Sequence, residues 1–179
     1  PPPPLASRDE TNENLKYAYY NGTDWTTMTL DGGAYNVGEY ASIALDTANR
    51  PHITYYNQTA ADLMYMFFDG SSWIKEIVYE TNSVGKHTSI DLDGDGDPHI
   101  AFFNQTSNDL MYTHNSGGVW NTETVDSTGL VGEYASISIG EDDEPHISYN
   151  DNTNSLVKYA TKDNGTWIFK EIDEEGDYN

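Results

Sequence analysis

The chain alternates apolar and polar positions in short runs. In residues 40–45, Ala41, Ile43 and Leu45 alternate with the intervening side chains, a period of two that is typical of a β-strand. Three further runs are rich in aromatic or β-branched residues: residues 52–56, 63–68 and 73–79. Turn-forming stretches of Asn, Asp, Gly and Ser separate the four runs. The pattern predicts a four-stranded antiparallel meander.

The meander pattern recurs every 47 to 48 residues. The columns that align are Trp25, Trp73, Trp120 and Trp167; the Pro-His-Ile triplets at 51, 98 and 145; Gly38, Gly85 and Gly132; Ser42, Ser89 and Ser136; and Tyr17, Tyr65, Tyr112 and Tyr159. A period of about 40 to 50 residues with this strand pattern predicts an all-β, β-propeller-like array of about three and a half four-stranded repeats. The small first strand is expected innermost, with Ile43, Ile90 and Ile137 between neighbouring repeats.

The repeats divide the chain into three parts. We expect a Pro-rich polar leader or linker at 1–13, one repeat domain at 14–173 and an acidic tail at 174–179. The domain comprises a half repeat, 14–31, and the full repeats 32–79, 80–126 and 127–173.

The half repeat raises the question of what pairs with its first strand. The leader is too Pro-rich and polar to supply two strands, so residues 15–20 are expected to present an unpaired edge. An upstream segment, closure onto the last repeat or another copy of the chain would cover that edge. A truncated piece of a longer propeller fits the half repeat equally well.

The turn before the fourth strand carries a family resemblance. It reads Thr161-Lys-Asp163-Asn-Gly165-Thr166-Trp167 in the last repeat and Asp69-Gly70-Ser-Ser-Trp73 in an earlier one. It resembles a degenerate Asp-box, a turn of sialidase-like propellers, and the whole repeat is similar to tandem blades of secreted and cell-surface prokaryotic proteins. The resemblance implies the fold rather than an activity.

Charge and composition narrow the function. The 30 acidic and 8 basic residues give a net charge of -22, which repels nucleic acid and anionic membranes. There is no Cys, so disulfides and thiol chemistry are excluded. No apolar run approaches the ~20 residues that span a bilayer, so membrane insertion is not expected.

One loop matches the core of calcium-binding loops. Its carboxylates alternate with other residues around a glycine: Asp91, Asp93, Asp95 and Asp97. Such carboxylates can converge on one Ca²⁺ ion, although position twelve is Phe102 rather than the Glu of an EF-hand. The pattern fits a calcium site and a plain polar hairpin equally well.

Histidine recurs at one repeat position, in His52, His99 and His146. These residues open the second strand rather than line the axis, so a three-His metal site is disfavoured against a structural role in which each ring bonds a neighbouring turn. His114 matches no column and is expected to face solvent.

Four Asn-x-Thr motifs fall in predicted turns, at Asn21, Asn57, Asn104 and Asn164. They are acceptors for N-glycosylation and favour a secreted or cell-surface location. Turns are also rich in Asn, Gly and Thr for conformational reasons alone.

The sequence predicts a protein that is not an enzyme. It contains no nucleophile elbow, phosphate loop or HExxH. Sialidases clamp a carboxylate with three Arg, and this chain has only Arg8 and Arg50.

The leading interpretation is therefore an extracellular structural or adhesive module that self-assembles with other copies of itself into a surface filament, stabilised by calcium. The alternatives are a glycan-binding lectin, in which Tyr and Trp stack on sugars, and a glycoside hydrolase.

Overall fold

The computed structural model describes residues 1–172, which form fifteen strands and no helix. Accordingly, no helix capable of crossing a membrane is present in that range.

Three of the four sheets have four strands. Sheet 1 contains β1 (Leu5–Asp9), β2 (Asn14–Tyr20) and β3 (Trp25–Asp31). Sheet 2 contains β4 (Val37–Leu45), β5 (Pro51–Asn57), β6 (Asp62–Phe68) and β7 (Trp73–Tyr79). Sheet 3 contains β8 (Val84–Leu92), β9 (Pro98–Asn104), β10 (Asp109–Ser116) and β11 (Val119–Asp126). Sheet 4 contains β12 (Val131–Ile139), β13 (Pro145–Asp151), β14 (Leu156–Asp163) and β15 (Thr166–Glu171).

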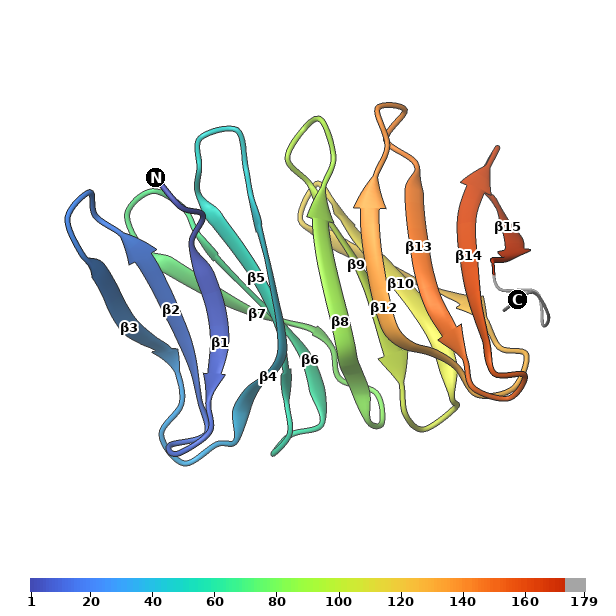
Figure 1. Ribbon diagram of the computed structural model, residues 1–179, viewed down its shortest axis with the longest axis horizontal. Coiled ribbons are helices and arrows are strands. Elements are labelled where there is room, and N and C mark those ends of the chain that lie inside the picture. Colours follow the sequence, from blue (N-terminus) through green and yellow to red (C-terminus); the bar gives the residue numbers. More distant parts are fainter. Residues whose placement is uncertain (173–179) are drawn as a thin grey trace, which may run out of the picture.

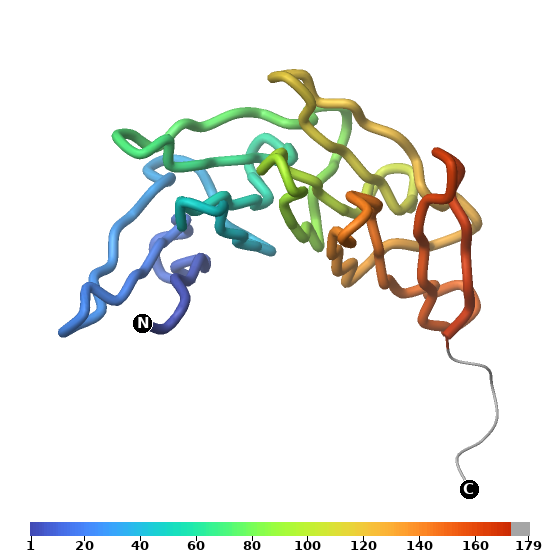
Figure 2. Tube along the Cα trace, turned by 90° about the horizontal axis from the view of Figure 1, so that it is seen from above, coloured from blue at the N-terminus to red at the C-terminus, as the bar shows by residue number. Residues whose placement is uncertain are grey.

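Each sheet is an antiparallel meander in chain order, as the sequence predicts. The sheets fan out along an arc (Figures 1 and 2). The first strands β4, β8 and β12 lie on the inner side of the arc, and the fourth strands lie outside (Figure 2). The predicted tail, 174–179, lies outside the described residues.

Sheet 1 corrects the expectation of an unpaired edge. Residues 5–9, which we assigned to the leader, form β1 and pair antiparallel with β2, from Leu5 opposite Ala18 to Asp9 opposite Asn14. The prolines end before the strand begins, and Ala6 packs into the apolar core. The overlooked signal is the 48-residue offset, which places Pro3-Pro4-Leu5 on Pro51-His52-Ile53. Sheet 1 therefore lacks only its innermost strand.

The cores lie between sheets. One apolar cluster fills the interface between each pair of neighbouring sheets, and we call these interfaces junctions 1/2, 2/3 and 3/4 after the sheets that they join. The predicted Ile column contributes to all three: Ile43 at junction 1/2, Ile90 at junction 2/3 and Ile137 at junction 3/4. A single meander cannot bury both faces, so stacking supplies the hydrophobic stabilisation.

The glycine column is explained by close approach between sheets. Gly85 has φ +103°, and a Cβ there would lie 2.7 Å from Leu63 Cα in the preceding sheet. Gly132 faces Leu110 at 2.6 Å in the same way. Only glycine allows the inner strand to pass this close to its neighbour.

The serine column links successive inner strands. The hydroxyl oxygen of Ser42 accepts the backbone N–H of Ile90 at 3.3 Å, and that of Ser89 accepts the N–H of Ile137 at 3.1 Å. The inner strands belong to separate sheets, so these side chains tie the sheets together near the axis.

Candidate functional site

Every junction holds three aromatic rings in the same arrangement. A Tyr on the third strand of the repeat (β2, β6 or β10) meets the Trp of the next sheet edge to face, with ring centroids 5.1 to 5.3 Å apart. A second ring stacks on the Tyr from two positions along its strand. The triplets are Tyr17, Tyr19 and Trp73; Tyr65, Phe67 and Trp120; and Tyr112, His114 and Trp167.

At junction 1/2 these rings line a cavity of about 350 Å³, which we call the aromatic groove. Its residues are Tyr17, Tyr19, Met28, Asn49, Pro51, Phe68 and Trp73. Tyr19 and Met28 are each 36% exposed. The groove therefore offers accessible apolar and aromatic surface, with hydroxyl and amide groups close by.

The other two junctions use the same space for internal contacts. Met28 corresponds to Glu76 and Glu123 in the repeat. Glu76 accepts the indole N–H of Trp120 at 3.1 Å. At junction 3/4, the Lys162 ammonium lies 5.1 Å from the ring centroids of both Tyr112 and Trp167 and pairs with Glu123. At junction 1/2 the equivalent side chain is Met28, which has no charged group to bond a ring N–H or to hold a cation over the rings.

Tyr17 also differs from its counterparts. The hydroxyls of Tyr65 and Tyr112 bond the Nδ1 atoms of His52 and His99, at 2.5 and 2.6 Å. Pro4 stands at the equivalent position in sheet 1, so Tyr17 has no imidazole partner there. Tyr17 is 9% exposed and lines the groove without this internal hydrogen bond.

The histidine column thus has the structural role that the sequence favours, but its main partner is different. Each Nδ1 bonds a Tyr on the adjacent third strand; His146 bonds Tyr159. The turn is a second partner for His99, whose Nε2 lies 3.3 Å from Asp93 Oδ2. Burial, partly offset by Asp46, lowers the pKa of His52, so this ring is neutral at pH 7. Both columns were visible in the sequence, but their pairing depends on strand register.

The expectation that His114 faces solvent is wrong. The ring stacks on His99 and Tyr112, with centroids 5.6 and 5.7 Å apart. Its Nδ1 is buried and has no hydrogen-bond partner within the described residues. His114 occupies the position of Phe67 in sheet 2, where an apolar ring stacks on His52. Burial lowers the pKa of His114.

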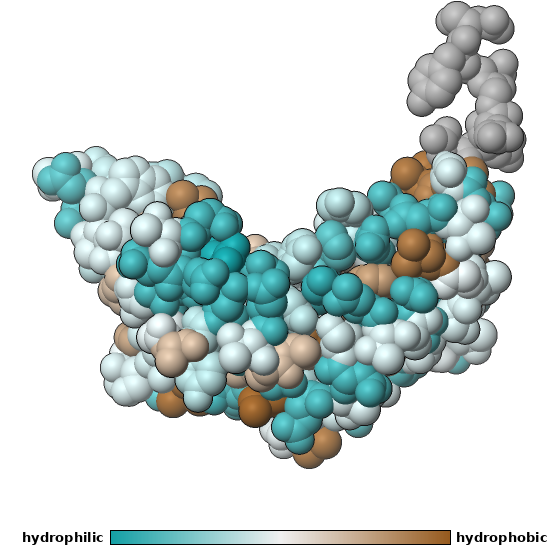
Figure 3. Space-filling view, turned by 90° about the horizontal axis from the view of Figure 1, so that it is seen from below, coloured by the Kyte–Doolittle hydropathy of each residue, from teal (hydrophilic) through white to brown (hydrophobic). Residues whose placement is uncertain are grey.

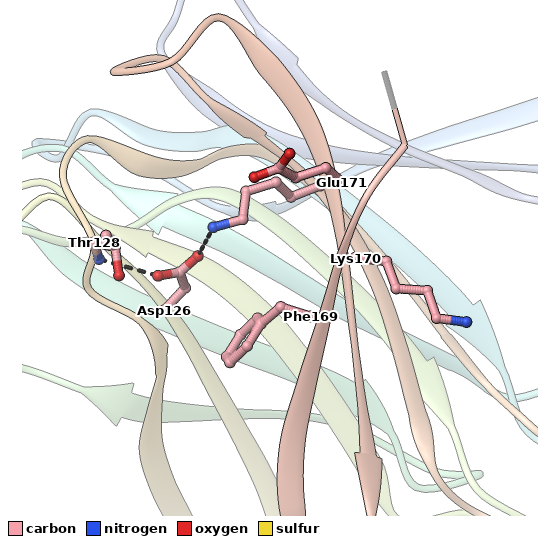
Figure 4. Close-up of a pocket in the computed structure, with 6 residues that line it drawn as sticks. Asp126, Thr128, Phe169, Lys170 and Glu171 are labelled. Carbon is pink, nitrogen blue, oxygen red and sulfur yellow. Dashed lines mark hydrogen bonds and ion pairs between the residues drawn. The ribbon is translucent and has the colours of Figure 1, made fainter. Parts of the chain in front are cut away.

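A second, polar hollow of about 510 Å³ lies at junction 3/4 (Figure 4). Asp126 Oδ2 accepts hydrogen bonds from Lys158 at 2.6 Å and from the Tyr149 hydroxyl at 2.8 Å, and Oδ1 accepts the Thr128 N–H. Burial raises the pKa of Asp126, but these partners outweigh burial and hold it below its ordinary value. Both oxygens of this carboxylate therefore already accept hydrogen bonds from the protein itself.

The repeats show that this ion pair serves packing. Junction 1/2 has the same three groups, in which Asp31 accepts bonds from Tyr55 and Lys75, although Lys75 stands on β7 at the position of Phe169 and Met64 stands at the position of Lys158. At junction 2/3 the positions of Asp126, Tyr149 and Lys158 carry Tyr79, Phe102 and Met111. Acid, hydroxyl and cation are thus present together or replaced together.

The four residues of the predicted calcium loop are used in different ways. Asp93 Oδ1 accepts the N–H groups of Asp95 and Asp97, as in a capped turn. Asp91 points to the next sheet, where Oδ2 accepts the Ile139 N–H at 2.8 Å. Within residues 1–172, no three acidic or His side chains are grouped to hold a metal ion. Calcium binding stays a prediction, and it depends most on Asp95 and Asp97.

The four glycosylation motifs occupy unequal positions. Asn21 and Asn164 lie in exposed hairpin turns. Asn57 is half-buried, and its Oδ1 accepts the Ala60 N–H. Asn104 is only 8% exposed, and its Oδ1 caps the turn that follows it. Asn21 and Asn164 are therefore the accessible acceptors.

The inner strands carry one ring contact that sequence reasoning missed. Tyr40, His87 and Tyr134 form a column at an offset of 47. Each has a left-handed φ of 51 to 56°, and His87 lies between the other two rings, with centroids 4.4 Å from each. This contact joins the three inner strands on the inner side of the arc.

Comparison with known proteins identifies the architecture. No family model and no curated protein matches the sequence. An AofleA variant from Arthrobotrys oligospora superposes with a TM-score of 0.69 at 13% identity, over 94% of this chain and 53% of that one. Aleuria aurantia lectin, in complex with Fucalpha1-6GlcNAc, gives 0.65 at 14% identity, over 96% and 62%. The Hadza microbial sialidase Hz136 gives 0.60 at 14%, over 90% and 41%.

The chain has a β-propeller fold. The described residues form three four-stranded blades of the predicted kind and one three-stranded blade, and the neighbours are propeller lectins and sialidases. The chain spans about two fifths to three fifths of the length of these propellers. At such low identity the likeness establishes the fold alone.

Proposed function

We propose that this propeller is a lectin-like module that binds neutral glycans in the aromatic groove. The observation that carries the proposal is that Tyr19, which is 36% exposed, and Trp73 line the groove together with Tyr17, whose hydroxyl lacks the His partner of its counterparts. Sugars present an apolar C–H face that stacks on aromatic rings and a hydroxyl rim that needs hydrogen bonds. Asn49 lines the same groove and supplies an amide.

Charge narrows the ligand class. The lining of the groove contains no Asp, Glu, Lys or Arg, and the chain carries a net charge of -22. The field of the protein therefore disfavours sialylated and sulfated glycans relative to neutral ones.

The same lining favours binding over hydrolysis in this groove. A glycoside hydrolase needs two carboxyl groups about 5 to 9 Å apart at the scissile bond, and the aromatic groove has none. A sialidase-type Arg cluster is also disfavoured. Arg8 pairs with Glu10 in sheet 1, and Arg50 pairs with Asp46 in sheet 2.

A glycan array with matched variants tests the proposal. We expect selective binding to neutral glycans, among which fucosides are the first probes because the lectin neighbour binds one. Tyr19→Ala should weaken binding about tenfold, the order expected for one stacking ring. Val119→Ala is the control, because Val119 is 61% exposed on a hairpin remote from the groove. No binding to any glycan, or equal binding by both variants, would reject the groove.

A secreted or cell-surface location belongs to the same proposal. Neutral glycans are abundant there, and the exposed motifs at Asn21 and Asn164 suit that compartment. Glycopeptide mass spectrometry of the protein secreted from a eukaryotic host would show glycans at these two sites and none at the buried Asn104.

A further inference from the structure

The two end faces of the arc expose residues whose repeat equivalents are buried. At sheet 4, Val157 on β14 and Ile172 directly after β15 are 39% and 59% exposed. Their equivalents in sheet 2 are Leu63 and Val78, which are 0% and 8% exposed in the core of junction 2/3. Exposed apolar side chains are also visible on the arm of the arc that carries sheet 4 (Figure 3). This face keeps the composition of a blade-packing surface.

Sheet 1 exposes the opposite kind of face. Leu5 is 54% exposed, whereas its equivalent Ile53 is fully buried at junction 1/2. Trp25 is 46% exposed, whereas its equivalent Trp73 is partly buried in the same junction. Terminal repeats of stacked arrays normally carry a polar outer face, and neither end of this arc does so at these positions.

The two faces complement each other in the way that all three junctions do. At each junction a third-strand Tyr meets the Trp of the following sheet edge to face. Tyr159 is the next member of the Tyr column and Trp25 the first member of the Trp column. Tyr159 stacks on His146 and Trp25 contacts Tyr20, each within its own sheet. The two end sheets thus carry the two partners of the repeated contact, the Tyr on sheet 4 and the Trp on sheet 1.

We propose that sheet 4 of one copy docks face to face on sheet 1 of a second copy, with Tyr159 against Trp25. The contact is head-to-tail, so it closes a ring of copies or propagates. It differs from strand exchange, because β1 already pairs with β2. It is independent of the proposed glycan binding, since neither Trp25 nor Tyr159 lines the aromatic groove.

Charge at the docking face supports this pairing. Two copies with a net charge of -22 repel each other. Lys170 on sheet 4 stands where Glu76 and Glu123 lie at the internal junctions, which removes a negative charge from the face that a second copy would meet. Association should strengthen with added salt, because screening weakens the remaining repulsion while the apolar contact persists.

Sedimentation equilibrium on the intact chain tests the proposal, from micromolar to near-millimolar concentration and in low and high salt. The wild type should form species heavier than its 20.0 kDa monomer. Trp25→Asp and Ile172→Asp should each weaken association at least about a hundredfold, because each places a charge in an apolar interface. Val119→Asp, at an exposed site on neither end face, should associate like the wild type.

Mixing the two deficient variants gives the decisive result. Each retains one intact face, so an equimolar mixture should form a 1:1 heterodimer through the surviving Tyr159 and Trp25 faces. A wild type that stays monomeric throughout would overturn the proposal and leave further blades of a longer polypeptide as the cover for these faces. Association that Trp25→Asp and Ile172→Asp do not weaken would also overturn it. Glycan binding by the same variants is a separate readout that does not depend on this outcome.

Discussion

At the scale of single residues, equivalent positions of the repeats can be compared with one another, and each difference suggests a substitution. Asp126→Asn should lower the free energy of unfolding by about 2 kcal/mol at pH 7, because it removes the nearer of the two anions that face the buried Lys158 ammonium and leaves only Asp151, whose Oδ2 lies 3.8 Å away. The triple change Asp126→Tyr, Tyr149→Phe and Lys158→Met copies junction 2/3 at these three positions and should recover part of that loss, since the buried Asp151 keeps its hydrogen bonds from Asn154. Urea unfolding measures both values. A triple variant no more stable than the single one would refute the view that these residues act as a set.

The acid dependence of Asp126 follows from the direction of its pKa shift. The folded pKa lies below the ordinary value of 3.8, so the unfolded chain binds the proton more readily. The stabilisation by this carboxylate is complete above pH 3.8 and is lost as the pH falls through the folded pKa. The difference between the wild type and Asp126→Asn should shrink in that acid range.

His114 gives a prediction of the opposite kind. Its pKa is lowered by burial from 6.5, so protonation favours the unfolded chain, and stability is lost as the pH falls below 6.5. His114→Phe copies sheet 2 and removes this proton. The variant should melt higher than the wild type, by a larger margin near pH 5 than near pH 7.5. Equal margins at both pH values would show that His114 is not held neutral by burial.

At the scale of strands and turns, two glycines allow the effect of close packing on stability to be distinguished from the effect of backbone strain. Gly85 and Gly70 have the same φ of +103°, but only at Gly85 would a Cβ meet another sheet. Gly70→Ala should therefore cost about 1 kcal/mol of stability, from the left-handed backbone alone. Gly85→Ala should cost several kcal/mol more, because it forces β8 away from Leu63. Similar losses for both variants in thermal or urea unfolding would contradict the close-approach explanation.

The β8–β9 hairpin allows a clean test of calcium. We expect Ca²⁺ to raise the melting temperature relative to chelator, since an ion that binds only the folded state stabilises it. Asp95→Asn with Asp97→Asn should abolish this rise and leave melting in chelator nearly unchanged. Asp93 is unsuitable for this test, because its side chain caps the turn. A wild type that melts identically with and without Ca²⁺ would reject the site.

At the scale of the whole molecule, the sequence predicts what repeats and misses what depends on neighbouring blades. Strand alternation and the Trp, Gly and Ile columns predicted the meanders, their order and the Ile43, Ile90 and Ile137 core, since these depend on local pattern. Strand β1 was missed because its polar residues and preceding prolines masked the 48-residue offset.

The aromatic groove could not be predicted for a related reason. Tyr17 and Trp73 lie 56 positions apart and meet only when two blades stack. The column positions alone do not tell whether a ring fills the core or lines a hollow. Met28 in place of Glu is a difference between repeats that acquires meaning only once the junctions are compared in space.

The four indole N–H groups, one in each repeat, allow the most direct test of glycan binding in the groove. In a ¹H–¹⁵N correlation spectrum of the protein titrated with the best-binding glycan of the array, the signal of Trp73 should shift with saturating concentration dependence. The signal of Trp25, which lies on the end face, should stay in place. Glycan binding that moves Trp25 and leaves Trp73 unchanged, or that moves neither signal, would contradict the account.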